Sequence, residues 1–311
     1  MRFNKLDLNL LVALDALLRH ESISRAAETL HMSQSAMSNA LARLREYFDD
    51  ELLVQVGRRM EPTPRAEALR DAVRDVLLRV DTTIAIQPGF DPVQSDREFK
   101  LFVSDYTLQV LAPHLMAVLA ERQAGIRLQL LPQSAHPQRA LERGEADLLI
   151  IPNEYGSPDH PSEPLFEETF CCLVWAGSRW ARQQAISFDD YAAASHVVMQ
   201  PTGGQPAFES WFMQRYGLRR HIGISTYSFG SLPPLVLHTE RIATVHQRLA
   251  TLAARQLPLS LIPAPVPIPT MQQSVQWHKY RSQDPGLVWL RGALGEAVER
   301  MDGVGGMGSG A

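Results

Sequence analysis

Apolar residues in the first part of the chain recur at the spacing of short helices. In the stretch 34–48, four of them fall at i, i+4, i+7 and i+11 and therefore on one side of an α-helix: Met37, Leu41, Leu44 and Phe48. Ser33 precedes this stretch, and its hydroxyl can cap the first turn. A shorter alanine-rich helix comes earlier, with Ser24 as its expected cap, and His31-Met32 supplies the turn between the two. The pattern predicts a helix-turn-helix.

The other side of the 34–48 helix is polar. Its first turns carry uncharged amide and hydroxyl groups, which can both donate and accept hydrogen bonds at the edges of DNA bases. A hairpin around Gly57 follows, and arginines of the helix and the hairpin are placed to reach phosphates. The expected DNA-binding residues are Ser33, Gln34, Ser35, Ser38, Asn39, Arg43, Arg58, Arg59 and Thr63.

Pro62-Thr63-Pro64 leads into a long helix expected over residues 65–86. Small or apolar residues in it alternate by three and four, the spacing of a coiled-coil seam: Ala66, Leu69, Val73, Val76 and Val80. Such a helix can pack on its own domain or pair with a second copy of itself. We favour pairing, because the helix lies between a DNA-reading head and a separate domain. Residues 88–98, which begin with Pro88-Gly89, are expected to form a hinge.

Short apolar strands alternate with helical segments from residue 99 onward. The expected strands are 99–103, 127–131, 148–151, 171–175, 196–199, 222–227, 242–245, 259–262 and 271–277. Alternation of this kind indicates mostly parallel sheets covered by helices on both faces. The proline-spaced stretch 263–269 must be extended, and we interpret it as a crossover between two subdomains rather than as a ligand for an SH3-type domain.

Composition limits the function classes. The chain has 311 residues, of which 45% are hydrophobic and 21% charged, as expected for a folded protein of two or three domains. A net charge of −4 does not by itself indicate DNA binding. The first apolar run is interrupted by Asp7, Asn9 and Asp15, unlike a signal peptide, and no later run is long enough to span a bilayer. We therefore expect a cytoplasmic protein without membrane contact.

Two adjacent cysteines, Cys171 and Cys172, lie in a strand-like run and should point to opposite sides of it. They cannot hold a metal ion by themselves, so no metal site is expected. Packing is the favoured interpretation, and a redox sensor is the alternative.

Several motifs resemble the LysR-type transcriptional regulators, and the resemblance runs through nearly the whole chain. They are the leucine-rich opening at residues 6–11, the Ala26-Ala27 helix, the stretch 33–38 and Glu61-Pro62-Thr63-Pro64. Phe90-Asp91-Pro92, Arg97-Glu98-Phe99 and Asp284-Pro285 with Trp289-Leu290-Arg291 are similar to the subgroup of nodulation and aromatic-degradation regulators. Family members often have proline where Ser35 stands, which affects the expected base contacts.

This resemblance implies an all-α N-terminal part followed by an α/β part. The implied domains are a winged helix-turn-helix over 1–64, a dimerising linker helix over 65–87, the hinge over 88–98, and an effector-binding domain over 99–302. The last consists of two Rossmann-like subdomains of the periplasmic-binding-protein type, about 99–164 with 268–302 and about 165–267. The glycine-rich tail 303–311 is expected to be disordered.

Loops that follow the predicted strands are the expected ligand contacts, because ligands of open α/β sheets bind at the carboxyl ends of strands. By resemblance to the family, these loops face one another across an inducer cleft. The expected effector-binding residues are Ser104, Asp105, Tyr106, Thr107, Thr202, Gln205, Phe229, Gly230 and His246. Helix capping by Ser104 and Thr202, core packing by Tyr106 and Phe229, and a structural hydrogen bond of His246 remain alternatives.

An enzyme is not expected, because the sequence has no nucleophile elbow, Walker loop, His-Glu-x-x-His motif or paired cysteine knuckles. The resemblance implies a cytoplasmic activator, without a cofactor, that responds to a small aromatic inducer. Its implied partners are double-stranded promoter DNA, RNA polymerase and further copies of itself in a homodimer or homotetramer. The alternative is a small-molecule binding protein without DNA function, which leaves the first sixty residues unexplained.

Overall fold

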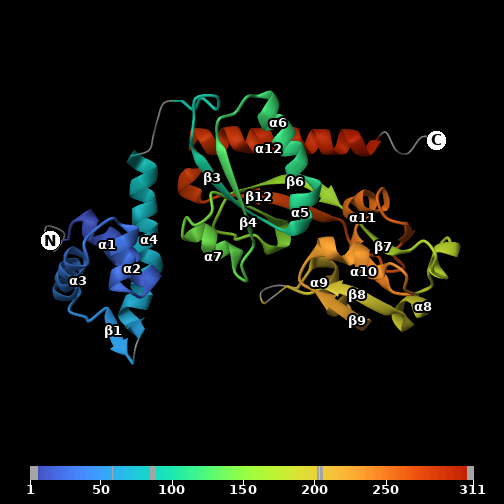
Figure 1. Cartoon of the computed structure of the whole chain (residues 1–311), viewed down its shortest axis with the longest axis horizontal. Coiled ribbons are helices and arrows are strands. Elements are labelled where there is room, and N and C mark those ends of the chain that lie inside the picture. The colour runs from blue at the N-terminus through green and yellow to red at the C-terminus, as the bar shows by residue number, and fades with distance from the viewer. Residues whose placement is uncertain (1–5, 58, 85–88, 202, 204–205, 307–311) are drawn as a thin grey trace. The chain divides into compact units, whose positions relative to one another are not determined.

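The computed structural model describes residues 6–57, 59–84, 89–201, 203 and 206–306, and these residues form two compact units. The first unit contains the described residues up to 84 together with 142–144, and the second contains the remainder. The first unit consists of α1 (Leu8–His20), α2 (Ile23–Thr29), α3 (Gln34–Phe48), β1 (Leu53–Val56), β2 (Arg59–Pro62) and α4 (Pro64–Ile84) (Figure 1). Helix α3 has the bounds that the apolar spacing predicts.

Side-chain caps begin the three short helices of the first unit. The Asp7 carboxylate accepts a hydrogen bond from Leu10 N at 2.9 Å, and Ser33 Oγ accepts one from Ala36 N at 3.1 Å. Ser22, and not Ser24 as expected, caps α2, because the helix already begins at Ile23 and Ser24 lies inside its first turn. Each cap satisfies a backbone N–H that has no partner within its helix.

Helix α4 contributes to the core of the first unit. Ala66 and Val73 are buried in the same cluster as the leucines of α1 and α3, and Leu69 packs against it. The N-terminal half of the expected coiled-coil seam is therefore covered by its own domain, so for this half the structure supports the alternative to pairing. Val76, which is 43% exposed, and Ile84, which is 78% exposed, remain open on the C-terminal half.

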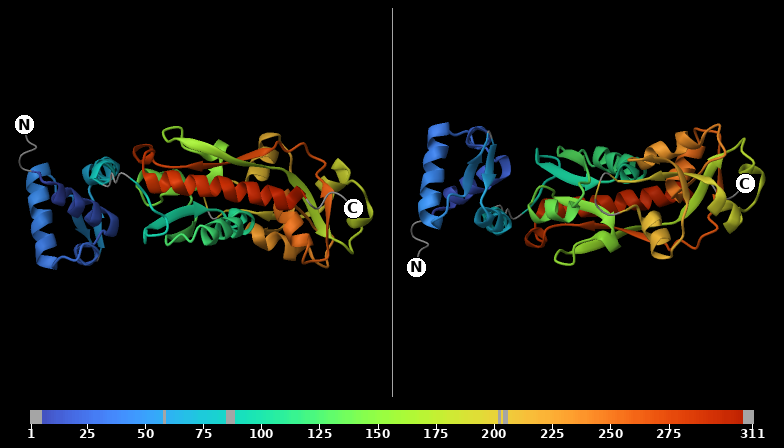
Figure 2. Two further views of the ribbon diagram at one scale, coloured as in Figure 1. Left: turned by 90° about the horizontal axis from the view of Figure 1, so that it is seen from above. Right: turned by 90° about the horizontal axis from the view of Figure 1, so that it is seen from below.

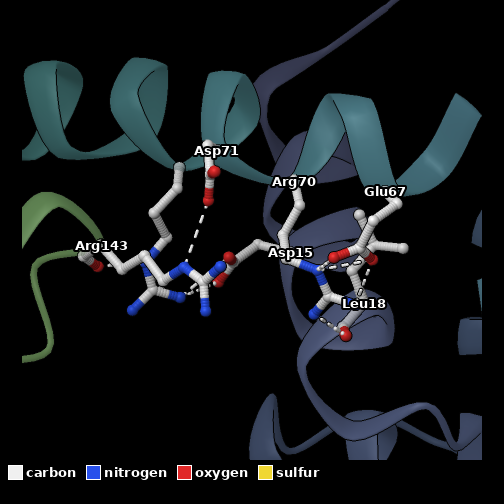
Figure 3. Close-up of polar contacts among 7 residues, drawn as sticks. Asp15, Leu18, Glu67, Arg70, Asp71 and Arg143 are labelled. Atoms are coloured by element: carbon white, nitrogen blue, oxygen red, sulfur yellow. Dashed lines mark hydrogen bonds and ion pairs between the residues drawn. The ribbon is translucent and has the colours of Figure 1, made fainter. Parts of the chain in front are cut away.

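Charged hydrogen bonds join α1 to α4 (Figure 3). The Asp15 carboxylate accepts two bonds of 2.8 Å from Arg74 Nη1, and both side chains are more than four-fifths buried. One turn away, the Arg70 guanidinium donates to the carbonyl oxygen of Leu18 and forms an ion pair of 2.8 Å with Glu67. These bonds supplement the apolar contacts in fixing the direction of α4 on the reading head.

The second unit contains two five-stranded sheets (Figures 1 and 2). The first sheet has the order β4-β3-β5-β12-β6, with β3 (Glu98–Val103), β4 (Arg127–Pro132), β5 (Leu148–Pro152), β6 (Ser162–Glu168) and β12 (Met271–Gln276). The second has the order β11-β7-β10-β8-β9, with β7 (Phe170–Trp175), β8 (Ser195–Met199), β9 (His221–Thr226), β10 (Ile242–His246) and β11 (Leu259–Pro263). We call the sheets and their helices subdomains I and II.

Both sheets are mixed, although the strand-helix alternation predicts mostly parallel ones. In subdomain I, β3 pairs in parallel with β4 and β5, whereas β12 is antiparallel to β5 and β6. In subdomain II, β8 is parallel to β9 and β10, whereas β7 is antiparallel to β10 and β11. Strand β6, which the sequence pattern does not predict, belongs to the first sheet. The chain therefore enters subdomain II at Thr169 and not at about residue 165 as expected. It returns through the extended, proline-spaced segment before β12.

Helices flank both sheets. They are α5 (Asp105–Val110), α6 (Ala112–Glu121), α7 (Pro137–Glu142), α8 (Phe188–Ala193), α9 (Phe208–Arg215), α10 (Leu232–Val236), α11 (Gln247–Ala254) and α12 (Pro285–Gly306), with 3₁₀ turns η2 (Asn153–Tyr155), η3 (Trp180–Arg182), η4 (Phe229–Ser231) and η5 (Lys279–Arg281). Helix α12 lies beside α6 in both views of Figure 2 and buries leucine and alanine residues one or two turns apart. It continues to residue 306, so the expected tail is partly helical, and residues 307–311 lie outside the described part.

The two cysteines lie on opposite faces of β7, as predicted, and each is buried in a different apolar cluster. Burial raises the pKa of Cys172 to about 12 and also raises the pKa of Cys171. Because the thiolate is the reactive form, this supports packing rather than redox chemistry. None of the helices in the described part of the chain has both the length and the hydrophobicity to cross a membrane.

Candidate DNA-binding face and ligand cavity

The polar face predicted for α3 is exposed. Gln34, Ser35, Ser38 and Asn39 are all open to solvent, while Met37 on the opposite side is fully buried. Ser33 and Ser35 share a hydrogen bond of 3.0 Å between their hydroxyls, next to the Ser33 cap. The first two turns of α3 therefore offer a row of uncharged donors and acceptors of the kind that reads base edges.

The arginines in and near α3 differ in how firmly other groups of the protein bind their guanidinium groups. Arg43 forms an exposed ion pair of 3.3 Å with Asp7, which is weak enough for a phosphate to replace. Arg45 instead donates to the carbonyl oxygens of Glu51 and Leu53, both at 2.8 Å, and so holds the start of the hairpin. Arg59 is exposed on β2, and Arg58 lies outside the described residues.

Thr63 has a structural role in the first unit. Its hydroxyl donates to the Asp50 carboxylate at 2.6 Å and accepts from Ala66 N at 3.1 Å, so it caps α4 while being half-buried. The hydrogen bond from the Thr63 hydroxyl lowers the pKa of Asp50. The expected DNA contact by Thr63 therefore competes with a capping function.

Replacing Gln34 with alanine should weaken specific DNA binding by about 1–3 kcal/mol and reduce discrimination between base sequences. The reason is that an amide at this exposed position can bond two atoms of one base. The Arg59→Ala variant is the matched control, because loss of a phosphate contact should weaken all sequences alike and reduce the salt dependence. Gel shifts at fixed salt, with specific and scrambled fragments, measure both. Unchanged specific binding of Gln34→Ala would show that this face does not read bases.

A cavity of about 790 Å³ lies in the second unit, between subdomains I and II. The carboxyl ends of β3, β4 and β5 reach it from one side, and those of β8 and β10 reach it from the other. Its described lining is Val103, Ser104, Asp105, Tyr106, Pro132, Gln133, Ser134, Ala135, His136, Pro137, Gln138, Ile151, Pro152, Tyr155, Met199, Pro201, Gly203, Pro206, Ala207, Phe208, Tyr227, Ser228, Phe229, His246 and Gln273. A cavity of this size at strand ends can hold a small organic molecule.

Five of the nine expected effector-binding residues line this cavity: Ser104, Asp105, Tyr106, Phe229 and His246. Thr107 and Gly230 do not. The Thr107 hydroxyl is buried against Ser104 Oγ at 3.0 Å, and Gly230 N donates to the Asp105 carboxylate at 2.9 Å, so both support residues of the wall. Thr202 and Gln205 lie outside the described residues.

Aromatic rings form a stack in the cavity wall. The rings of Tyr106 and His246 are parallel within 15° and 3.9 Å apart, and the Phe229 ring meets His246 edge-on at 4.7 Å. Tyr106 and His246 come from different subdomains, so the stack joins the two sides. Burial lowers the pKa of His246 to about 3, which keeps the imidazole neutral at pH 7.

Glu168, which the sequence analysis does not predict as a site residue, holds the Tyr106 ring of this stack by a hydrogen bond. Its side chain is 1% exposed and accepts the Tyr106 hydroxyl hydrogen, a bond from Thr169 N at 2.9 Å and one from Arg248 N at 3.5 Å. The Arg248 guanidinium lies 3.6 Å from the same carboxylate. Because β6 ends at Glu168 and α11 begins beside it, this one carboxylate connects subdomain I to α11 of subdomain II.

Sequence reasoning missed several residues of the wall. Gln133 and Ser134 follow β4, Tyr155 lies in η2, and Gln273 lies on β12. The position of Gln133-Ser134 after a predicted strand was an available signal, whereas Gln273 lies inside a strand and gave none. The buried atoms Gln273 Oε1 and His246 Nδ1 have no hydrogen-bond partner among the described residues.

Two family models match the chain. Residues 8–67 match the model described as a bacterial regulatory helix-turn-helix protein of the lysR family, and residues 93–299 match the LysR substrate binding domain. The chain is 39% identical over 302 residues to Nodulation protein D 1 of Bradyrhizobium diazoefficiens, covering 97% of this chain and 96% of that protein. It is also 39% identical over 303 residues to Nodulation protein D 1 of Sinorhizobium fredii, covering 97% and 94% of the two chains.

Solved structures agree with these matches. A probable transcriptional regulator from Pseudomonas aeruginosa is 30% identical, with a TM-score of 0.64 over 94% of this chain and 97% of the other. A cysteine variant of full-length OxyR from the same species has a TM-score of 0.74 at 19% identity, over 94% of each chain. The second likeness shows a shared fold, with a helical N-terminal part and two α/β subdomains.

Proposed function

Because the chain belongs to the LysR family of transcriptional regulators, we propose that it activates transcription in response to a small aromatic or phenolic inducer held in the cavity between subdomains I and II. Members of this family bind promoter DNA and small-molecule effectors, form oligomers and are not enzymes. The observation that carries the proposal is the cavity of about 790 Å³, which is walled by aromatic rings at the carboxyl ends of strands from both sheets.

Aromatic chemistry of the inducer is supported by the wall itself. Tyr106, Phe208 and Phe229 offer ring faces and edges, and a planar ligand can stack on such surfaces. Gln273 Oε1 and His246 Nδ1 belong to lining residues and have no hydrogen-bond partner among the described residues, so they are candidate partners for a hydroxyl group of the ligand. Regulation of aromatic or chlorinated-aromatic catabolism and sensing of flavonoids are both compatible with this chemistry.

On the DNA side, the proposal assigns the exposed face of α3 to base reading and the exposed residues of α4 to pairing of two chains. Two reading heads then contact two half-sites on one face of the promoter. Activation further requires contact with RNA polymerase, and we propose that the protein acts in the cytoplasm, where promoter DNA is found. An inducer that binds one degree of cavity closure more tightly than another would shift the protein toward that closed state. This shift would change how the two DNA-binding units of a dimer are arranged on the promoter.

Replacing Phe229 with alanine tests the cavity as the inducer site. The variant should bind the inducer at least about tenfold more weakly, because a buried aromatic contact is worth roughly 1.5–3 kcal/mol. Operator binding without inducer should stay at the wild-type level. Calorimetry with naringenin, 4-chlorophenol, hydroquinone and salicylate, together with operator gel shifts, measures both effects. The matched control is Phe188→Ala, because Phe188 is exposed on α8 away from the cavity lining.

Wild-type affinities in Phe229→Ala for every compound that binds would place the inducer elsewhere. The alternative hypothesis is a small-molecule binding protein without DNA function. A gel shift in which the wild-type protein retards a specific promoter fragment would exclude it.

A further inference from the structure

Asp105 is an acidic residue in the wall of a cavity proposed to hold an aromatic compound. It is the first residue of α5, and its carboxylate is half-buried. Oδ2 accepts a hydrogen bond of 2.7 Å from Ser228 Oγ and one of 2.9 Å from Gly230 N. Both donors belong to subdomain II, whereas Asp105 belongs to subdomain I. The carboxylate therefore bridges the two sides of the cavity and engages two donors at its edge.

The described lining of the cavity is poor in groups that could neutralise a second negative charge. Its described lining contains neither lysine nor arginine. Between residues 201 and 206, the positions outside the described residues are Thr202, Gly204 and Gln205, which are uncharged by sequence. Of the two lining histidines, His246 is buried and neutral, and His136 lies exposed in the loop before α7.

We propose that Asp105 makes this cavity selective for uncharged phenolic compounds and against aromatic carboxylates. The inference rests on the proposed function, because it assigns a ligand class to the same cavity. A ligand carboxylate would lose its hydration, would find the donors Ser228 and Gly230 already engaged, and would be repelled by the Asp105 charge. An uncharged phenol loses less hydration free energy than a carboxylate and is not repelled by the Asp105 charge, and it can still use the aromatic walls.

The Asp105→Asn substitution removes the negative charge at this position while the hydrogen-bonding geometry can stay the same. The asparagine side chain keeps an oxygen that can accept from Ser228 and Gly230, so the bridge between subdomains can persist while the negative charge is removed. Asp189→Asn removes the same charge from an exposed position at the start of α8 and is the matched control.

The test uses salicylamide and salicylate, which have nearly the same shape but differ in charge, in calorimetric titrations of the full-length protein. The wild type should bind salicylamide at least about tenfold more tightly than salicylate. In Asp105→Asn this ratio should fall about tenfold, mainly because salicylate binds more tightly. Asp189→Asn should keep the wild-type ratio. Operator gel shifts without ligand confirm that each variant is folded and paired.

Two results would overturn the proposal: equal or tighter binding of salicylate by the wild type, or an unchanged ratio in Asp105→Asn. The Phe229→Ala variant separates this failure from failure of the proposed function. If Phe229→Ala weakens both compounds while Asp105→Asn leaves their ratio unchanged, the cavity is the ligand site and only the charge selection is wrong. If Phe229→Ala changes neither affinity, the cavity is not the ligand site and both proposals fall.

Discussion

Replacing Glu168 with alanine should lower the free energy of unfolding of the second unit by about 1–3 kcal/mol, the usual cost of leaving a buried hydrogen-bonding group without its partner. The buried Tyr106 hydroxyl would lose its acceptor, Thr169 N would lose one at the edge of the buried region, and Arg248 would lose a neighbour 3.6 Å away. Inducer binding should weaken as well, since the hydroxyl bond holds the Tyr106 ring in the cavity wall.

Urea unfolding followed by tryptophan fluorescence measures this loss, because all five tryptophans lie in the second unit. Glu167→Ala is the matched control, since that neighbouring side chain is exposed. Tyr106→Phe removes one hydrogen bond and keeps the ring, and should cost about 1–2 kcal/mol. A loss below about 1 kcal/mol in Glu168→Ala would mean that water or a rearranged Arg248 satisfies these groups.

Introducing aspartate at both Val76 and Ile84 should weaken operator binding at least about a hundredfold, because four charges would then enter the seam between two α4 helices. Both side chains are exposed within the first unit, so the single chain should fold normally. Leu69, by contrast, packs against the reading head, and an aspartate there would disturb the head itself. Sedimentation velocity reports the oligomer, and gel shifts report DNA binding.

Thr82→Asp is a matched control for this pair of substitutions. At 100° per residue, Thr82 lies on the side of α4 opposite to Val76 and Ile84, and its side chain is half-exposed. It should leave both the oligomer and the DNA affinity at wild-type values. A doubly substituted protein that still sediments as the wild type would exclude this face of α4 from pairing.

Regular elements were predictable where one periodic pattern dominates. Helix α3 has the predicted bounds because its apolar stripe and its serine cap indicate the same start. Strand β6 was missed because Ser162–Glu168 is acidic and contains Pro164, features that resemble a loop but are tolerated at the edge of a sheet. The glycines at 303, 305 and 306 predict a disordered tail from residue 303, whereas α12 continues through them to residue 306 in the structure.

In the candidate sites as well, some residues could be predicted from the sequence and others could not. Loops after predicted strands supplied Ser104, Asp105 and Phe229, because the position of a strand end in the chain determines its position in the sheet. Partners distant in sequence could not be derived this way. Glu168 acts through Tyr106, which lies on α5, and Gln273 reaches the cavity from inside β12, so the roles of both depend on sheet order. The burial of half of the α4 seam likewise depends on how helices pack, which spacing alone does not determine.

The order of strands in subdomain I has a consequence for how this chain is made. Strand β12 lies inside the first sheet, between β5 and β6, yet it begins only at Met271, after the whole of subdomain II has been synthesised. Subdomain II is continuous in sequence and can close on the ribosome as soon as it emerges, whereas β5 and β6 must wait for a strand to separate them. Until then, both carry unpaired backbone edges, which makes the nascent chain a natural client for chaperones.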